Sequence, residues 1–190
     1  MYRAIVSIKG TAPLSQSRQH ETEKLDGERP DDYDKRTWRE KCNYDDKGIV
    51  FVPAMAFKQA MDTSAKRLNI KDAVNGGKST MTKHFASDVI CEKNLSIGVH
   101  KNDMTSVRIS ANSDGIRGSG KRVPRTLPQI QEWAGQTSFL VMDEKVSPEM
   151  FQRVLEASGR SIGVGQFRPE KGGLNGRFEI SKIKFEKMEI

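Results

Sequence analysis

The sequence is short of the residues on which many functions depend. Of its 190 residues only two are cysteine and three are histidine, and aromatic residues make up 7%. Cys42 and Cys91 belong to no CxxC or cysteine–histidine cluster, so we expect ordinary buried or half-buried thiols and neither a disulfide framework nor a zinc site. No run of about 18 apolar residues occurs, and the apolar start is too short for a signal peptide. We therefore expect a cytoplasmic protein without membrane association.

What the sequence does have is positive charge. Lysine and arginine number 32 against 25 aspartates and glutamates, which gives a formal net charge of +7. The segment from Arg18 to Lys47 carries eight basic and ten acidic residues, a net of −2, so the rest of the chain holds +9. A basic surface outside this segment favours an acidic partner such as nucleic acid.

Hydrophobic patterns predict several short strands. Residues 2–9 alternate between apolar and polar side chains, and apolar runs predict further strands over 49–52, 85–92, 95–100, 107–110 and 137–142. A last strand over 177–185 has apolar residues that change phase halfway. A β-bulge near Ser181 would explain the change.

Two helices are indicated by their ends and by their apolar spacing. Pro53 precedes a segment, residues 54–68, whose apolar residues recur three and four positions apart, as on the buried side of a helix. In the second, Ser147 is an N-cap residue, Pro148 occupies the first helical position and Gly159 is expected to end the helix.

The order strand, helix, strands, helix, strand predicts an α+β, ferredoxin-like domain of βαββαβ type, the RRM-like architecture of many RNA-binding domains. We expect a single domain over residues 1–190. Residues 14–47 have no sustained period and form an insertion after the first strand, in which Trp38 and Tyr44 argue for partial order. Because one fold hosts many functions, function has to come from particular residues.

The first of two glycine-rich segments, residues 111–128, contains the strongest local run of positive charge. Its sequence DGIRGSGKRVPR separates the cations by glycine. Cations in such a run do not pack in a core, so we expect an exposed loop that presents them to phosphates, with a merely solvated loop as the alternative. The cations are Arg117, Lys121, Arg122 and Arg125.

The second glycine-rich segment, residues 159–177, lies between the second helix and the last strand. Five glycines within it, from Gly163 to Gly176, alternate with basic residues that include Arg160 and Arg168. Backbone amides beside guanidinium groups form a phosphate-binding surface. The alternative is that the glycines only build a tight turn.

Three segments together carry a family resemblance. They are APLSQSR at 12–18, GIVFVPAMAFKQAMDTSAKRL at 48–68 and GVGQFRPEKGGLNGRFEI at 163–180. They resemble, in this order, the loop that bears an insertion, the strand–proline–helix unit and the C-terminal glycine-rich loop of the RAMP superfamily of CRISPR-associated proteins. The similarity is to the backbone subunits that line up along guide RNA. The whole pattern also resembles uncharacterised proteins carried by bacteriophages.

The resemblance implies a binder of single-stranded RNA or DNA whose copies stack head to tail or associate with related subunits. The sequence itself shows no Ser/His/Asp or Cys/His arrangement and no carboxylate cluster with the spacing of a metal site, so we expect no cofactor, no metal and no catalytic residue. The tripeptide before the helix lysine is small in this superfamily but here is Met55, Ala56 and Phe57, which is bulkier. Carried onto this sequence, the implied contacts are Gln16, Arg18, Lys58, Gly163, Gly165, Arg168, Lys171 and Arg177.

Two other functions stay open. Some RAMP relatives cut RNA without a metal through a histidine, and the candidates here are His20 and His84, expected in loops, and His100, expected at a strand end. The other alternative is a viral mimic of a backbone subunit that acts by protein–protein interaction, with the insertion as its docking arm. If the protein binds single-stranded nucleic acid, its glycines and arginines contact the backbone more than the bases, so we expect binding that is independent of base sequence.

Overall fold

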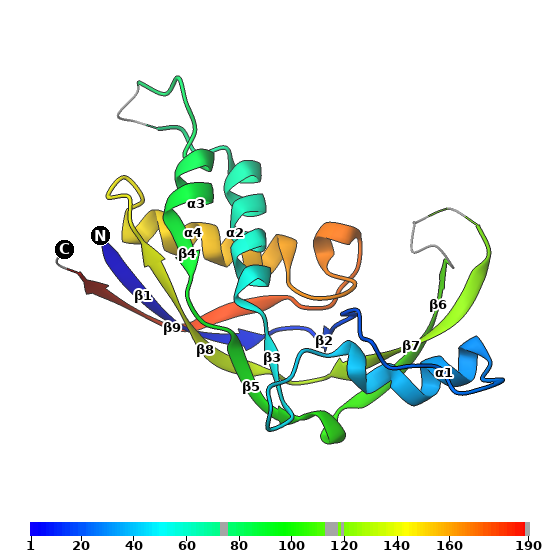
Figure 1. The fold of residues 1–190 in the computed structure, drawn as a ribbon. Helices are drawn as coiled ribbons and strands as arrows, with labels where there is room; N and C mark the ends of the chain where they lie inside the picture. The colour runs from blue at the N-terminus through cyan, green and yellow to red at the C-terminus, as the bar shows by residue number, and fades with distance from the viewer. Residues whose placement is uncertain (73–75, 113–117, 119, 189–190) are drawn as a thin grey trace.

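The computed structural model describes residues 1–72, 76–112, 118 and 120–188, and its centre is a four-stranded antiparallel sheet (Figure 1). The strands lie in the order β4-β8-β1-β9. All three pairings are antiparallel. Together with the helices that follow β1 and β8, this is the ferredoxin-like βαββαβ unit predicted from the sequence. The bounds are Tyr2–Gly10 for β1, Val89–Cys91 for β4, Ala134–Val141 for β8 and Phe178–Lys187 for β9.

Three helices lie on one face of this sheet (Figure 1). They are α2 (Ala54–Leu68), α3 (Thr82–Asp88) and α4 (Pro148–Ala157). The apolar stripe predicted for α2 is confirmed, because Phe57, Met61 and Ala65 are buried. Among the described residues, no helix combines the length and the apolar character that crossing a bilayer requires.

The core lies between the sheet and these helices. Alternate residues of β1, namely Ala4, Val6 and Ile8, point into it and are at most 1% exposed. Phe139 of β8 and Phe151 of α4 meet there edge to face with ring centroids 5.3 Å apart. Burying a side chain of this kind contributes about 2 to 3 kcal/mol each, so the aromatic layer is a major source of stability.

Helix α4 begins as predicted but ends later. The Ser147 hydroxyl accepts a hydrogen bond from Met150 N at 3.2 Å, which is the predicted N-cap. Gly159 does not end the helix, because the chain continues as a π-helical turn, Ser158–Ile162, and leaves it at Gly163 with φ 72°. A Cβ at Gly159 would lie 2.1 Å from the carbonyl oxygen of Phe178, so close packing on β9 is what requires glycine there.

The predicted bulge in β9 is confirmed. Ser7 of β1 pairs with Lys182, whereas the next residue, Ile8, pairs with Ile180. Ser181 is therefore the extra residue, and its hydroxyl donates a hydrogen bond to Ser7 O at 3.1 Å. The bulge restores the inward direction of the apolar residues on both sides of it.

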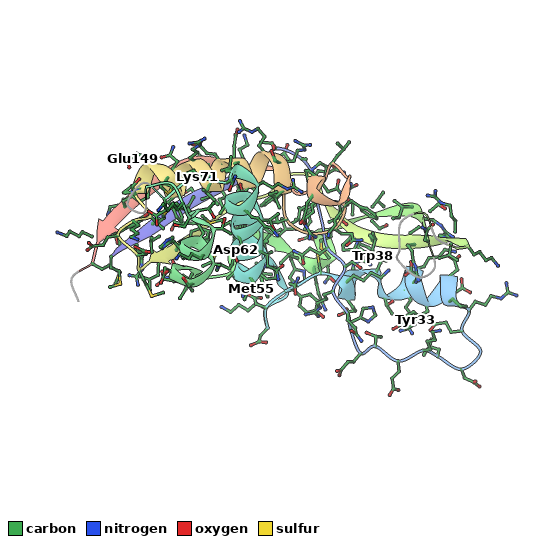
Figure 2. The ribbon with its side chains drawn as sticks, turned by 90° about the horizontal axis from the view of Figure 1, so that it is seen from above. Tyr33, Trp38, Met55, Asp62, Lys71 and Glu149 are labelled. Carbon is green, nitrogen blue, oxygen red and sulfur yellow. The ribbon has the colours of Figure 1, made fainter. Side chains whose placement is uncertain are left out.

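Two insertions in the ferredoxin-like unit, residues 11–53 and 92–133, pack together as an insertion lobe beside the core (Figure 1). Strand β2 pairs with β7, β6 pairs with β7, and β3 pairs with β5. Figure 2 shows this lobe, with Tyr33 and Trp38, extending to one side of the helices. Its elements are β2 (Leu14–Ser15), α1 (Pro30–Thr37), β3 (Ile49–Val52), β5 (Leu95–His100), β6 (Thr105–Asn112) and β7 (Arg122–Ile130).

The first insertion is more regular than its sequence indicated. Helix α1 is not indicated by the sequence, because only Asp34 and Thr37 of its residues are buried and it therefore has no apolar stripe. Trp38 follows it in a 3₁₀ turn and is 8% exposed, which confirms it as an anchor.

Two predicted element boundaries, those of the strand over 85–92 and of the basic loop over 111–128, were wrong. The first four residues of the strand predicted over 85–92 are the end of α3, and the strand begins only at Val89. Phe85 is buried in the core and belongs to that helix. The basic run predicted as a loop also differs, since Arg122 and Arg125 lie on β7 in a regular hairpin with β6.

Candidate nucleic-acid interface

The glycine-rich loop, residues 163–177, is folded tightly on itself. Val164 N donates to Gly176 O at 3.0 Å, and a Cβ at Gly176 would lie 1.7 Å from Val164 O. Gly163, Gly165 and Gly176 have φ between 69° and 78°, where other residues are strained. These glycines are therefore required by the shape of the loop itself.

The loop is also fastened to the insertion lobe. Gln166 N donates to Ser15 O at 2.7 Å, and a Cβ at Gly165 would lie 2.3 Å from the same oxygen. Ser15 belongs to β2, which pairs with β7. Strand β2 thus joins the glycine-rich loop to β7, the strand that begins in the first glycine-rich segment, although 30 residues separate the two segments in the sequence.

The exposed cations of these two segments lie on the two elements that β2 joins, the glycine-rich loop and the β6–β7 hairpin. Lys171 is exposed on the loop, as is Arg160 just before it, and Arg177 is half-buried. On the hairpin, Arg122 precedes the β2-paired end of β7 by eight residues, roughly 26 Å along a strand. Lys121, Arg122 and Arg125 are exposed there, and Arg117 lies outside the described residues.

A groove of about 340 Å³ separates the loop from α2. Arg168 lines it, but its guanidinium is paired with Glu170 at 2.8 Å and donates to Gly165 O at 3.2 Å. Asp62 of α2, labelled in Figure 2, lines the other wall and is paired with Lys58 at 2.5 Å. Because Arg168 and Lys58 are each paired with a carboxylate, this groove is a poor place for a phosphate.

Gln16, predicted as a contact residue, is only 4% exposed. Its amide nitrogen donates to Phe51 O at 2.9 Å, and its amide oxygen accepts from Asn43 N at 2.7 Å. These bonds hold the chain after β2 against β3, so the residue has a clear structural role.

Arg18 and Lys58, also predicted as contacts, are engaged within the protein. The guanidinium of Arg18 lies 4.8 Å from the ring centre of Tyr44, and its Nε donates to Glu40 O at 3.0 Å. The ammonium of Lys58 donates to Phe85 O at 2.9 Å, near the C-terminal end of α3, where a cation stabilises unpaired carbonyls. Both side chains would have to leave these partners to reach a phosphate.

The three histidines lie in different surroundings. The His20 ring stacks on Tyr33 with centroids 6.0 Å apart, and His100 Nδ1 accepts from Asn102 N at 3.2 Å. His84 was expected in a loop but lies on α3, with its Nδ1 2.5 Å from Asp143 Oδ2.

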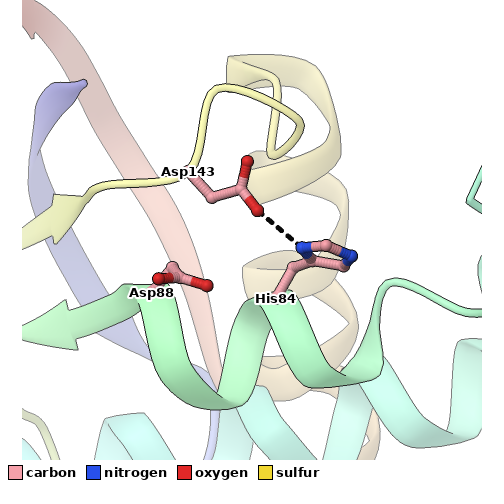
Figure 3. A group of neighbouring side chains, drawn as sticks. All are labelled: His84, Asp88 and Asp143. Carbon is pink, nitrogen blue, oxygen red and sulfur yellow. Dashed lines mark hydrogen bonds and ion pairs between the residues drawn. The ribbon is translucent and has the colours of Figure 1, made fainter. Parts of the chain in front are cut away.

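His84 also belongs to a group that the sequence did not reveal. Potential ligand atoms of His84, Asp88 and Asp143 all lie within 4.8 Å of one another, and Figure 3 shows the three side chains converging from α3 and the turn after β8. His84 and Asp88 are four residues apart on one helix, so they share a face. The predicted strand over 85–92 would have placed them apart, which is why sequence reasoning missed the group.

Both thiols are shielded, as predicted. Cys42 and Cys91 are buried and unpaired. Burial raises the pKa of Cys42 to about 12 and raises the pKa of Cys91 above its ordinary value. The reactive thiolate is therefore scarce at neutral pH.

The arrangement is that of an α+β, ferredoxin-like protein with a large insertion lobe and a C-terminal glycine-rich loop. Comparison with solved structures finds this fold in a chain of the type III-B Cmr-beta complex bound to cognate target RNA, at 15% identity and a TM-score of 0.57. The match covers 98% of this chain and 61% of that one. Cmr6 from Pyrococcus furiosus is similar at 12% identity and a TM-score of 0.50, over 95% of this chain and 99% of Cmr6.

Both neighbours share the α+β architecture of this chain, so the predicted ferredoxin-like fold is confirmed. No protein-family profile matches the chain, and no curated protein matches it by sequence. At this level of identity the similarity concerns the fold, and the binding properties of the neighbours belong to those proteins.

Proposed function

We propose that this protein binds single-stranded nucleic acid through the backbone phosphates, independently of base sequence, and that it does so without a cofactor or a catalytic step. The observation that carries the proposal is the pair of exposed basic segments, one on the glycine-rich loop and one on the β6–β7 hairpin, held together by β2. Similarity of fold to a chain from an RNA-bound complex supports it.

The bound strand would run over the outer side of the loop and along the hairpin, avoiding the groove beside α2. Arg160, Lys171 and Arg122 are exposed along this path, whereas Asp62 and Glu170 line the groove. Phosphates are attracted to the first set and repelled by the second. A rigid loop loses little conformational entropy when it orders a strand, which favours binding.

Fluorescence anisotropy with labelled single-stranded RNA and DNA of about 40 nucleotides, across a salt series, tests the proposal. If about six phosphates are neutralised, the logarithm of the affinity falls with the logarithm of salt at a slope of about −4. Lys121→Glu/Arg122→Glu and Arg160→Glu/Lys171→Glu should each weaken binding at least about 10-fold.

Lys66→Glu/Arg67→Glu provides the matched control. These two residues are exposed in the last turn of α2, and the variant changes the net charge equally. If it weakens binding as much as the other two variants, the attraction depends only on net charge and the proposed path is wrong. Absence of binding to either polymer at low salt would overturn the function as a whole.

A non-catalytic role predicts that labelled RNA stays intact during incubation with the protein in EDTA. Cleavage that disappears in His84→Ala or His20→Ala would instead show a metal-independent endoribonuclease.

We further propose that several copies, or copies with related subunits, align head to tail along one strand. Met55 is 61% exposed on α2 one turn before Gln59, which lines the groove, and Leu174 is 73% exposed on the glycine-rich loop. Contact with a neighbouring subunit would remove these two exposed apolar side chains, one on α2 and one on the glycine-rich loop, from water. Sedimentation on strands of about 10 and 40 nucleotides should show one and several copies, and Met55→Glu should reduce the number on the longer strand.

A further inference from the structure

The group formed by His84, Asp88 and Asp143 has the composition of a metal site. It offers one imidazole nitrogen and two carboxylate oxygens, all within 4.8 Å of one another. Imidazole and carboxylate are the usual ligands of divalent first-row transition metals, and three protein ligands leave positions for water. His84 Nδ1 and Asp143 Oδ2 are 2.5 Å apart and would have to separate to roughly 3 Å to share one ion.

The other nitrogen of the same ring gives an independent observation. His84 Nε2 is buried and makes no hydrogen bond in the structure, although a carboxylate oxygen of Asp72 lies 3.6 Å away. Asp72 is 1% exposed and comes from a different segment, the chain after α2. A histidine that binds a metal through one nitrogen usually directs the other toward a carboxylate, which fixes the ring orientation. Asp72 is placed for that role.

Charge at this place is also opposite in sign to the net charge of the protein. The carboxylates of Asp72, Asp88 and Asp143 lie around the imidazole, and the ammonium of Lys145 is 3.6 Å from Asp72. The whole chain carries +7. A local excess of negative charge in a basic protein is stabilised by a bound dication.

Asp143 is held in a geometry suited to a ligand. Its Oδ1 accepts from Lys145 N at 2.9 Å, so the carboxylate is oriented by its own turn while Oδ2 faces His84.

We propose that His84, Asp88 and Asp143 bind a divalent transition-metal ion such as Zn²⁺, Mn²⁺ or Co²⁺, with Asp72 as the positioning residue behind the imidazole. Such an ion would link the chain before α3, α3 itself and the turn after β8. Mg²⁺ and Ca²⁺ prefer all-oxygen sites and should bind much more weakly. The site is independent of nucleic-acid binding, and either proposal can fail while the other holds.

Isothermal titration of the metal-free protein with Zn²⁺, Mn²⁺ and Mg²⁺ tests the site, together with visible absorption spectra of added Co²⁺. We expect one Zn²⁺ per chain and a rise in Tm of roughly 5 °C at a 100-fold excess over Kd. We expect the Co²⁺ bands to report nitrogen and oxygen ligands.

Four variants and two matched controls make the test specific. His84→Gln should abolish binding, and Asp88→Asn, Asp143→Asn and Asp72→Asn should each weaken it about 10- to 100-fold. Circular dichroism of the metal-free variants shows whether they fold, and the half-buried positions of Asp88 and Asp143 tolerate Asn better than the buried position of Asp72 does. The controls His100→Gln and Asp103→Asn, which lie outside the group, should bind like the wild type.

A Zn²⁺ Kd weaker than about 1 mM for the wild type would overturn the proposal. So would undiminished binding by folded His84→Gln or Asp88→Asn, because the metal would then lie elsewhere. Equal loss in the two control variants would show non-specific binding to surface side chains and would overturn it as well.

Discussion

The ferredoxin-like core and the insertion lobe are stabilised by different interactions. In the core, Phe57, Phe85, Phe139 and Phe151 are fully buried and meet other aromatic rings or the apolar face of the sheet. In the insertion lobe, apolar residues such as Trp38, Val50 and Ile97 are also buried, but ion pairs between basic and acidic residues join its segments in addition. The lobe therefore combines apolar packing with charge pairing.

Asp34 illustrates the charge pairing in the insertion lobe. It is 4% exposed, lies 2.5 Å from Lys41 Nζ and accepts a hydrogen bond from Thr126 N, so it joins α1 to the 3₁₀ turn and to β7. Lys41 in turn donates to Thr126 O at 2.6 Å. Because these groups satisfy one another, the hairpin that carries the exposed cations is positioned by charge pairing. The difference teaches that apolar packing fixes the core, whereas the lobe also needs buried polar partners to place its segments.

The largest effect is expected from shortening a core side chain. Phe151→Ala should lower the free energy of unfolding by about 4 kcal/mol, because it leaves a cavity under α4 where the ring meets Phe139. Urea unfolding followed by circular dichroism measures the change. Leu174→Ala, at a 73% exposed position, should change it by less than about 0.5 kcal/mol. Similar losses in both variants would show that burial does not decide stability here.

A somewhat smaller effect is expected in the insertion lobe. Asp34→Asn should cost about 3 kcal/mol, because it leaves the ammonium of Lys41, 12% exposed, without its counter-charge. Amide hydrogen exchange should show the loss in α1 and β7 and much less in the central sheet. Asp32→Asn on the exposed side of the same helix is the control and should have little effect. Uniform loss of protection across the sheet would mean that lobe and core unfold together.

The junction between the two regions depends on a glycine. Gly165→Ala should cost about 2 kcal/mol, since its φ is 78° and the added Cβ would lie 2.3 Å from Ser15 O. Gly27→Ala is the matched control, because φ is 68° there but no atom lies within 4 Å of the added Cβ. In thermal unfolding, Gly165→Ala should have a lower Tm than Gly27→Ala. The opposite ranking would mean that the clash is relieved and that the loop is not fixed on β2.

The smallest effect concerns pH. Glu28 in the insertion lobe is paired with Arg36 at 2.7 Å, and this hydrogen bond is the main reason that its pKa falls from 4.5 to about 2. Because the folded pKa is depressed, the pair contributes stability above pH 4.5 and loses it as the pH falls toward 2. Urea unfolding of Glu28→Gln should differ from the wild type at pH 6 and converge with it near pH 2. Glu21→Gln, at an exposed position, is the control; a difference for Glu28→Gln that persists at pH 2 would contradict the assignment.

The order of the core elements could be predicted from the sequence, because their periodicity reflects burial directly. The stripe of α2, the Ser147 cap of α4 and the Ser181 bulge all followed from local residue patterns. Helix α1 could not be found in this way, because its buried residue Asp34 is charged and one of its partners, Thr126, lies on the second insertion.

The candidate site was predictable in part. Exposed cations such as Lys171 and Arg122 were identified from charge and glycine content, and nucleic-acid contact by them stays a prediction. Gln16 and Lys58 were selected through a family resemblance, and their hydrogen bonds within the protein could not be seen in the sequence. The same holds for the Arg168–Glu170 pair, which makes the groove less basic than its residues suggested.

By itself the sequence determined the fold class, the two glycine-rich basic segments and the buried thiols, because each of these depends on neighbouring residues or on composition. The tertiary structure decided which distant segments meet. It joined the glycine-rich loop to β7 through β2, and it brought Asp143 to His84 across 59 positions. Such contacts arise from the packing of whole elements, in which long-range pairing of strands and helices overrides local patterns.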